Sequence, residues 1–170
     1  IIVSDSLVPG EGEHKFMPEI RSLVKKDPEA KVVIQSPDGD IIMLAISTHK
    51  NNIYILREPD DQKLIELYQG DEFIYLDINK TKDHFLESLV QEYDGEIDKE
   101  RHMVDFVFLT FFAGNDFIIP PPYLKIKEKG MEKLITIYKR LFPEEDEYLV
   151  TKDFNINLDF FRNIVRELAE

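Results

Sequence analysis

Three short runs of β-branched and aromatic residues, separated by segments with helical periodicity, constrain the fold of this chain most strongly. Residues 31–36 (KVVIQS), 52–58 (NIYILRE) and 72–78 (EFIYLDI) have the composition of strands, and residues 1–4 have the character of a buried strand end. Where strands alternate with helices along a sequence, the helices usually cover both faces of one sheet. The pattern therefore predicts an α/β fold with a mainly parallel sheet flanked by helices.

Apolar residues at helical spacing predict the segments that connect and extend these strands. One helix directly follows Asp40, where IIMLAIS is apolar on most sides, and it ends near His49. The most apolar helix stops at Gly114, because glycine commonly ends a helix, and the prolines at 120–122 then force an extended connection. The remaining predicted helices cover residues 11–26, 79–93, 98–113, 128–141 and 158–169.

The composition limits the class of protein. The chain has 170 residues, enough for one domain with a core, a net charge of −13 and no cysteine. An acidic chain is a poor candidate for an isolated nucleic-acid-binding patch, but an enzyme can act on nucleic acid through bound cations. The absence of cysteine is compatible with a reducing compartment, and we expect an intracellular protein, either cytoplasmic or nuclear. No apolar run reaches membrane-spanning length, so we expect no membrane partner. The strand-like start at Ile1 indicates that a preceding part is missing.

Residues 9–15 (PGEGEHK) place Glu11 and Glu13 one residue apart, between two glycines. Three interpretations compete. The glycines match only part of a dinucleotide-binding fingerprint, and two carboxylates would repel a pyrophosphate. Acidic residues in the first turn of a helix stabilise it through the helix dipole by roughly 0.3–1 kcal/mol each. The third possibility is half of a metal site; taken alone, the segment favours the ordinary helix start.

Asp38 and Asp40 follow the strand 31–36 in the segment SPDGD. Ligands of open α/β sheets bind outside the carboxyl ends of the strands, where both carboxylates can face a crevice. A turn followed by a helix N-cap explains the same residues, because Asp-Gly is a common turn pair. Since the apolar helix begins directly after Asp40, we expect this pair to lie against the core.

Asp116, in the segment AGNDF, follows the most apolar helix of the chain. An aspartate after a glycine is a common loop residue. Its neighbours FFAG and FIIP, however, predict apolar surroundings, in which a carboxylate must be paired or bound to a cation.

The five acidic residues together indicate a function more specifically than any one of them does alone. Each lies at the boundary of a strand or of a core helix, and the topology gathers such boundaries along one edge of a sheet. Carboxylates without cysteine suit oxygen-preferring ions such as Mg²⁺ or Mn²⁺. Two ions about 3.5–4 Å apart support in-line displacement at phosphorus. The set therefore predicts a two-metal site made of Glu11, Glu13, Asp38, Asp40 and Asp116.

The motifs PGEGEHK, SPDGDIIML followed by ISTHK, ILRE and FVFLTFFAGNDF together resemble the Xrn-type 5′→3′ exoribonuclease family. Their order and approximate spacing agree with that family, which belongs to the PIN-like and flap-endonuclease-like superfamily. The segments LKIKEKGMEKLITIYK and INLDFFRNIVRELAE resemble the helical continuation of its first conserved region. The resemblance covers essentially the whole chain.

This resemblance implies a division of the chain and a role for each acid. Residues 1–125 would be part of the α/β nuclease domain that carries the metal site, and residues 126–170 its helical extension. Glu11 would lie nearer the first ion and Glu13 between the two, whereas Asp38, Asp40 and Asp116 would serve the second ion. His14, Lys15 and His49 lie inside the matching motifs, but we assign them no chemistry.

The resemblance also implies the reaction and the partners. An intact enzyme would hydrolyse RNA that carries a 5′-monophosphate and release nucleoside 5′-monophosphates. The resemblance implies that the family's N-terminal portion, which should supply two further metal-binding aspartates and the basic pocket for the 5′-monophosphate, is absent from this chain. The chain alone should therefore be inactive or very weakly active. In addition, IIPPPYLKI after Asp116 lacks the histidine usual in the family. A flap-type structure-specific DNA nuclease and a non-catalytic scaffold domain of the same fold remain as alternatives.

Overall fold

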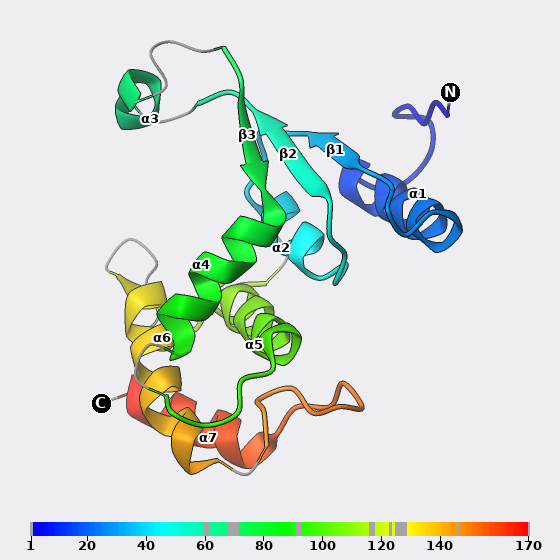
Figure 1. Ribbon diagram of the computed structural model, residues 1–170. Coiled ribbons are helices and arrows are strands. Elements are labelled where there is room, and N and C mark those ends of the chain that lie inside the picture. Colours follow the sequence, from blue (N-terminus) through cyan, green and yellow to red (C-terminus); the bar gives the residue numbers. More distant parts are fainter. Residues whose placement is uncertain are drawn as a thin grey trace. The chain divides into compact units, whose positions relative to one another are not determined.

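The computed structural model describes residues 2–59, 62–67, 72–90, 93–115, 118–122, 124, 129–145 and 147–169. They belong to two compact units, Ile1–Asn79 and Lys80–Glu170 (Figure 1). The division lies inside helix α4, two residues after its start. The boundary expected at residue 125 remains a prediction. No helix in the described ranges is both long and apolar enough to cross a membrane.

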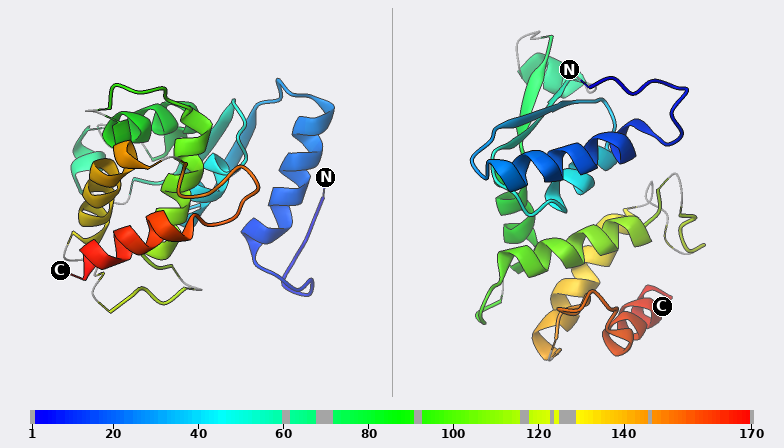
Figure 2. Two further views of the ribbon diagram at one scale, coloured as in Figure 1. Left: turned by 90° about the horizontal axis from the view of Figure 1, so that it is seen from below. Right: turned by 90° about the vertical axis from the view of Figure 1, so that its right-hand side faces the viewer.

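The first unit is a small mixed sheet with helices. Its elements are α1 (Gly12–Lys26), β1 (Val32–Gln35), α2 (Asp40–Ile46), β2 (Ile53–Arg57), α3 (Gln62–Leu67) and β3 (Ile74–Asp77). The strand order is β1-β2-β3; β1 pairs in parallel with β2, and β3 pairs antiparallel with β2. Helix α1 runs alongside β1 in both Figure 1 and Figure 2, and it buries Met17, Ile20 and Val24.

The expected strands at 31–36, 52–58 and 72–78 are confirmed, but the expectation of a mainly parallel sheet is not. β3 pairs antiparallel with β2, with Tyr54 opposite Asp77 and Arg57 opposite Ile74. The 16 residues between the two strands, 58–73, are enough for either direction. Strand-forming residues predict where a strand lies but not how it pairs, so the sequence pattern did not determine this direction.

Only one face of the sheet is covered by the described residues. Val32 and Ile34 of β1 are buried together with Ile53 and Ile55 of β2. On the other face Val33 is 53% exposed, so helices on both faces, as the sequence predicted, are not found in the described ranges. Residues 2–4 are exposed and lie outside the strands, which corrects the expectation of a buried strand end there. A strand end is buried only when a neighbouring strand or helix packs on it.

The second unit is helical, with α4 (Ile78–Val90), α5 (Lys99–Phe112), α6 (Gly130–Leu141), the 3₁₀ turn η2 (Phe142–Glu144) and α7 (Leu158–Leu168). Helix α6 packs against α5 and α7, and its residues Leu134 and Tyr138 are fully buried. A short bridge between Val150 and Ile156 closes the loop that precedes α7. The predicted helices are confirmed to within a few residues at each end.

Candidate functional site

Glu11 and Glu13 lie at the start of α1. Glu11 occupies the N-cap position without a capping bond from its side chain, and Glu13 is in the first turn. The turn before them needs a glycine, because Gly10 has a φ of 104°. Lys15 donates a hydrogen bond from Nζ to the carbonyl oxygen of Asp5 over 2.8 Å, which ties this turn to the helix. Both carboxylates therefore lie at the positive end of the helix dipole.

Asp38 and Asp40 lie between β1 and α2. The Asp38 backbone N–H donates to Ser36 Oγ over 3.1 Å, and Asp38 Oδ1 accepts from the Asp40 N–H over 3.2 Å. Asp40 is half-buried, but Asp38 is exposed, so the expectation that both lie against the core is wrong for Asp38. Asp38 instead bonds to local backbone, as aspartate does in turns before helices. This bond uses one carboxylate oxygen and leaves the other for a ligand.

Asp116 lies outside the described residues. Before it, Gly114 has a φ of 112°, and its neighbour Asn115 accepts a hydrogen bond at Oδ1 from the Ile118 N–H over 2.8 Å. Ile118 is 47% exposed and Ile119 is 92% exposed. Ile118 and Ile119 therefore do not contribute the buried surroundings that the sequence suggested for Asp116.

The five predicted metal ligands do not meet in a complete site among the described residues. Within these ranges no three histidine, aspartate or glutamate side chains are placed to hold one metal ion. The described acids form two local pairs, one at the start of α1 and one after β1. Carboxylates are the donors that Mg²⁺ prefers, so the chemistry of each pair fits. The two-metal set remains a prediction.

A cavity of about 300 Å³ opens at the carboxyl ends of β1 and β2, directly before Asp38. This is the position at which open α/β sheets bind ligands. Arg57, the last residue of β2, and Phe73 belong to its lining. Among the described residues, the lining comprises Gln35, Ser36, Pro37, Leu56, Arg57, Glu58 and Phe73.

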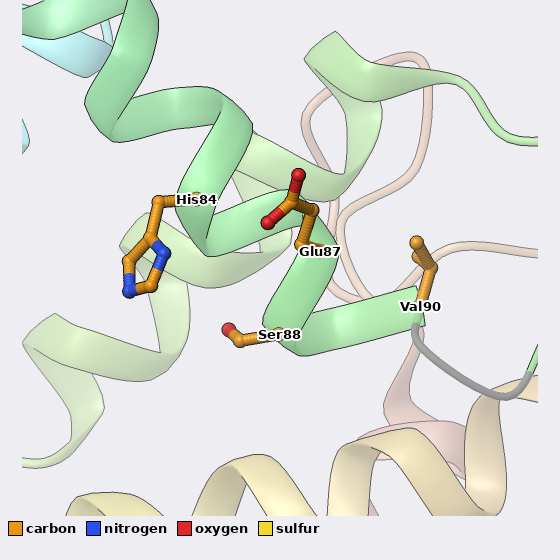
Figure 3. A pocket seen from close by; sticks show the side chains of 4 residues that line it. All are labelled: His84, Glu87, Ser88 and Val90. Carbon is orange, nitrogen blue, oxygen red and sulfur yellow. The ribbon is translucent and has the colours of Figure 1, made fainter.

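A second cavity, of about 530 Å³, lies along α4 and is lined by His84, Glu87, Ser88 and Val90. Figure 3 shows His84 and Ser88 on the same side of the helix, a spacing that would allow a nucleophile and a base. The Ser88 hydroxyl, however, donates to the Phe85 carbonyl oxygen over 2.8 Å. Because this proton is bound to the backbone and not to the imidazole, the pair is not an activated serine.

A buried polar cluster in the second unit was not predicted from the sequence. Asp105 of α5 is fully buried and accepts hydrogen bonds from the Tyr138 hydroxyl (2.8 Å) and from the backbone N–H groups of Leu149 (2.9 Å) and Val150 (2.8 Å). Burial raises the pKa of Asp105 from 3.8 to about 6, although these three bonds and Arg101 act in the opposite direction. The carboxylate thus attaches the loop before α7 to α5 and α6.

His102 lies one turn before Asp105 and is also fully buried. Its Nδ1 is 3.2 Å from the Tyr138 hydroxyl, and its Nε2 has no hydrogen-bond partner in the described part of the chain. Burial lowers the pKa of His102 from 6.5 to about 4, against a weaker opposing effect of Asp98. Since the Tyr138 proton goes to Asp105, the neutral imidazole donates from Nδ1. The only sequence signal for this cluster was polar residues within an otherwise apolar helix.

Arg101 also connects the loop before α7 to α5, through contacts separate from those of Asp105. Its Nη2 donates to Glu147 Oε1 over 2.8 Å and to the Val150 carbonyl oxygen over 2.6 Å. The guanidinium carbon lies 4.8 Å from the centre of the Tyr148 ring. These contacts hold a loop in place and expose no reactive atom, so we assign the cluster to stability and not to catalysis.

Comparison with known proteins places two family matches along the chain. Residues 1–59 match the family described as "XRN 5'-3' exonuclease N-terminus", and residues 96–170 match "Xrn1 helical domain". The first match contains four of the five predicted metal ligands. The second contains the buried polar cluster and the position of Asp116.

Individual relatives match over nearly the whole chain. The "5'-3' exoribonuclease 2" of Debaryomyces hansenii is 32% identical over 99% of this chain and 19% of its own length. The protein of the same name from Candida albicans is 34% identical over 99% of this chain and 20% of its own length. A "5'-3' exoribonuclease 2 homolog" of Caenorhabditis briggsae is 35% identical over 100% of this chain and 21% of its own length. The chain thus spans about a fifth of the length of these relatives.

Proposed function

The chain belongs to the Xrn-type 5′→3′ exoribonuclease family, and we propose that it is part of an enzyme that degrades RNA from the 5′ end. The observation that carries this proposal is the identity of 32–35% with proteins named 5'-3' exoribonuclease, extending along 99–100% of the chain. The proposed reaction is hydrolysis of 5′-monophosphorylated RNA to nucleoside 5′-monophosphates.

We further propose that two divalent ions, Mg²⁺ or Mn²⁺, are bound by Glu11, Glu13, Asp38, Asp40 and Asp116. When bound, such ions polarise the phosphoryl oxygens and make water a stronger nucleophile. The donor chemistry supports the proposal, because all five residues carry carboxylates and the chain has no cysteine. The short turns at Gly10 and Gly39 place each pair at the start of a helix, where its backbone is held by hydrogen bonds.

The chain's own residues would bind and orient the substrate beside these acids. Arg57 lines the cavity that opens before Asp38, and a guanidinium matches the geometry of phosphate oxygens. Phe73, in the same lining, offers a ring against which a base can pack. We propose that this cavity receives the nucleotide next to the scissile phosphate.

We propose that the 170-residue chain alone has little or no activity. Two observations support this: the described residues do not form a three-acid site by themselves, and the chain spans about a fifth of its relatives. The partner that completes the site would be the N-terminal portion of the same enzyme, which also would recognise the 5′-monophosphate. Robust magnesium-dependent degradation of RNA by the purified chain would contradict this part of the proposal.

The central experiment is substitution of the acids in an enzyme that contains this chain. Asp38→Asn and Asp116→Asn should each abolish degradation of 5′-monophosphorylated RNA in Mg²⁺ while largely preserving RNA binding, because the charge lost is a metal ligand. Asp153→Asn, at an exposed loop position, removes the same charge and should leave degradation unchanged. Wild-type turnover by either site variant would refute the metal assignment.

Substrate class needs a separate experiment, because carboxylates alone do not distinguish RNA from DNA. The same enzyme should degrade 5′-monophosphorylated RNA in preference to a flapped DNA duplex when both are present in equal amounts. Preferred cleavage of the flap would favour a structure-specific DNA nuclease. Failure of calorimetry to detect Mg²⁺ or Mn²⁺ binding would favour a non-catalytic scaffold.

A further inference from the structure

A third cavity, of about 470 Å³, lies between the end of α4 and helix α6 in the second unit. Its size falls within the range of small-molecule sites, roughly 300–1,000 Å³. It is lined by Leu89, Tyr93, Thr136, Lys139, Arg140 and Pro143. None of these residues belongs to the acidic set or to the buried polar cluster.

Two cations line one side of this cavity. Thr136, Lys139 and Arg140 are spaced i, i+3 and i+4, so they share one face of α6. Arg140 is paired with Glu167 of α7, whereas Lys139 is half-buried and makes no hydrogen bond or ion pair with the described residues. No acidic residue is among the described lining. Lys139 therefore gives the described lining an ammonium group that no described carboxylate neutralises, and such a charge attracts an anion.

An aromatic ring and aliphatic side chains line the cavity beside these cations. The Tyr93 ring is held edge-on against Phe142, with 5.2 Å between the ring centres. Its hydroxyl lies so close to Gly95 that a Cβ at position 95 would be 2.2 Å away. These contacts fix the orientation of the ring before any ligand binds. Leu89 and Pro143 add apolar surface to the same cavity.

From this arrangement we infer that the cavity between α4 and α6, which we call the α4–α6 cavity, binds a nucleoside monophosphate. The phosphate pairs with Lys139, whose neighbour Arg140 is paired with Glu167, and the base packs against Tyr93. A fixed ring beside an ammonium group matches this chemistry, since bases stack on aromatic side chains and phosphates pair with ammonium groups. Other aromatic anions would fit the same lining, and we choose a nucleotide because the proposed function is RNA degradation; this part of the inference rests on that proposed function. The nucleotide is either a free mononucleotide or one unit of an RNA chain.

Calorimetric titration of the purified 170-residue chain with 5′-AMP tests this inference. EDTA is present, so that ions at the acidic residues do not contribute. We expect one AMP to bind per chain, with adenosine and inorganic phosphate each binding at least about tenfold more weakly. Lys139→Gln and Tyr93→Leu should each weaken AMP binding by about tenfold, as expected for one charge-assisted contact or one base stack. Tyr93→Phe keeps the ring and should bind like the wild type.

Lys152→Gln is the matched control, because Lys152 is exposed, lies in the loop before α7 and is not in the cavity lining. It should bind AMP like the wild type. The inference would be overturned if Lys139→Gln and Lys152→Gln weakened AMP binding equally. It would also be overturned if the chain bound AMP and inorganic phosphate with equal affinity, or if it bound neither AMP nor oligoadenylate. Tyr93→Leu could lose AMP binding because it destabilises the fold, which a lower midpoint of urea unfolding would reveal. In that case the AMP affinity of Lys139→Gln is the deciding measurement, because Lys139 makes no hydrogen bond or ion pair with the described residues.

A parallel titration with a short 5′-hydroxyl oligoadenylate distinguishes the two sources of the nucleotide. Oligoadenylate binding at least about tenfold tighter than AMP, with the same sensitivity to Lys139→Gln, identifies an RNA chain; equal or weaker binding identifies a free mononucleotide. The experiment is independent of catalysis. AMP binding without Asp38-dependent cleavage would leave the cavity assigned and refute the proposed function. Asp38-dependent cleavage without AMP binding would refute only the cavity.

Discussion

Asp105 and His102 are one turn apart on α5, and both side chains are fully buried, yet their ionisation acts on stability in opposite directions. The pKa of Asp105 is raised to about 6 by burial, so folding favours its protonated form. The stability that this proton provides is present below the ordinary pKa of 3.8 and is lost as the pH rises through 6. The pKa of His102 is lowered to about 4, so its neutral form contributes stability above 6.5, which is lost as the pH falls through 4.

Single substitutions should therefore expose two opposite pH dependences. In Asp105→Asn, stability relative to the wild type should rise with pH between 4 and 6, and in His102→Gln it should fall over the same interval. Each difference should approach about 1.4 kcal/mol per pH unit, the free energy of one proton. Urea unfolding at pH 4.5, 5.5 and 6.5 measures both. Parallel curves for the two variants would contradict the assignment of either pKa.

At Gly114, as at Gly10, the backbone conformation itself limits substitution. The Gly114 φ of 112° is unfavourable for any residue with a side chain, and an added Cβ would lie 2.8 Å from Pro120 Cδ. Gly114→Ala should therefore reduce the free energy of unfolding by about 1–3 kcal/mol. Gly12→Ala is the control, because a Cβ there meets nothing within 4 Å and alanine favours the helix. Equal effects of the two substitutions in urea unfolding would disprove the explanation.

At the scale of single elements, the N-cap of α5 is the clearest local determinant. Asp98 Oδ1 accepts hydrogen bonds from the backbone N–H groups of Glu100 (3.1 Å) and Arg101 (3.2 Å). Asp98→Ala should reduce the free energy of unfolding by about 1 kcal/mol. Asp98→Asn keeps a capping oxygen and should cost much less. The thermal midpoints of the two variants check this, and a midpoint for Asp98→Asn as low as that for Asp98→Ala would show that charge, not capping, matters.

The elements were predictable from the sequence because their signals are local. Helical spacing located α1, α5 and α7 to within a few residues, and Gly114 marked the end of α5 correctly. The direction of β3 was not predictable, because strand-forming residues indicate where a strand lies but not how it pairs with its neighbour. The open face of β1 was missed for a similar reason, since Val33 resembles a buried strand residue until its surroundings are known.

At the scale of the whole molecule, the candidate site was only partly predictable. The sequence located Glu11, Glu13, Asp38 and Asp40 at the ends of elements, and each pair lies where expected along the chain. How far pairs from different segments approach one another is a property of tertiary packing, which local patterns do not encode. The buried bonds of Asp105 were missed for the same reason, because its partners are 33 to 45 positions away in sequence.

The second unit contains a core of its own, so it should fold when produced separately. Leu109, Leu134 and Phe160 are fully buried within it, and Asp105 joins its helices. Residues 78–170, which keep α4 whole, should give a helical circular dichroism spectrum and a cooperative thermal transition. Asp105→Asn should change the stability of this fragment as much as that of the 170-residue chain. A fragment that melts without cooperativity would show that its core is incomplete.

The bonds from Asp105 to Leu149 and Val150 also bear on the order of folding events. Each joins residues 44 or 45 positions apart, so chain entropy must be lost over a long loop before the carboxylate meets its donors. Helices α5 and α6 can form earlier from contacts between near neighbours. We therefore expect the attachment of this loop to follow the rate-limiting barrier. Breaking it should accelerate unfolding and leave the refolding rate almost unchanged, so that Asp105 governs how long the folded unit persists.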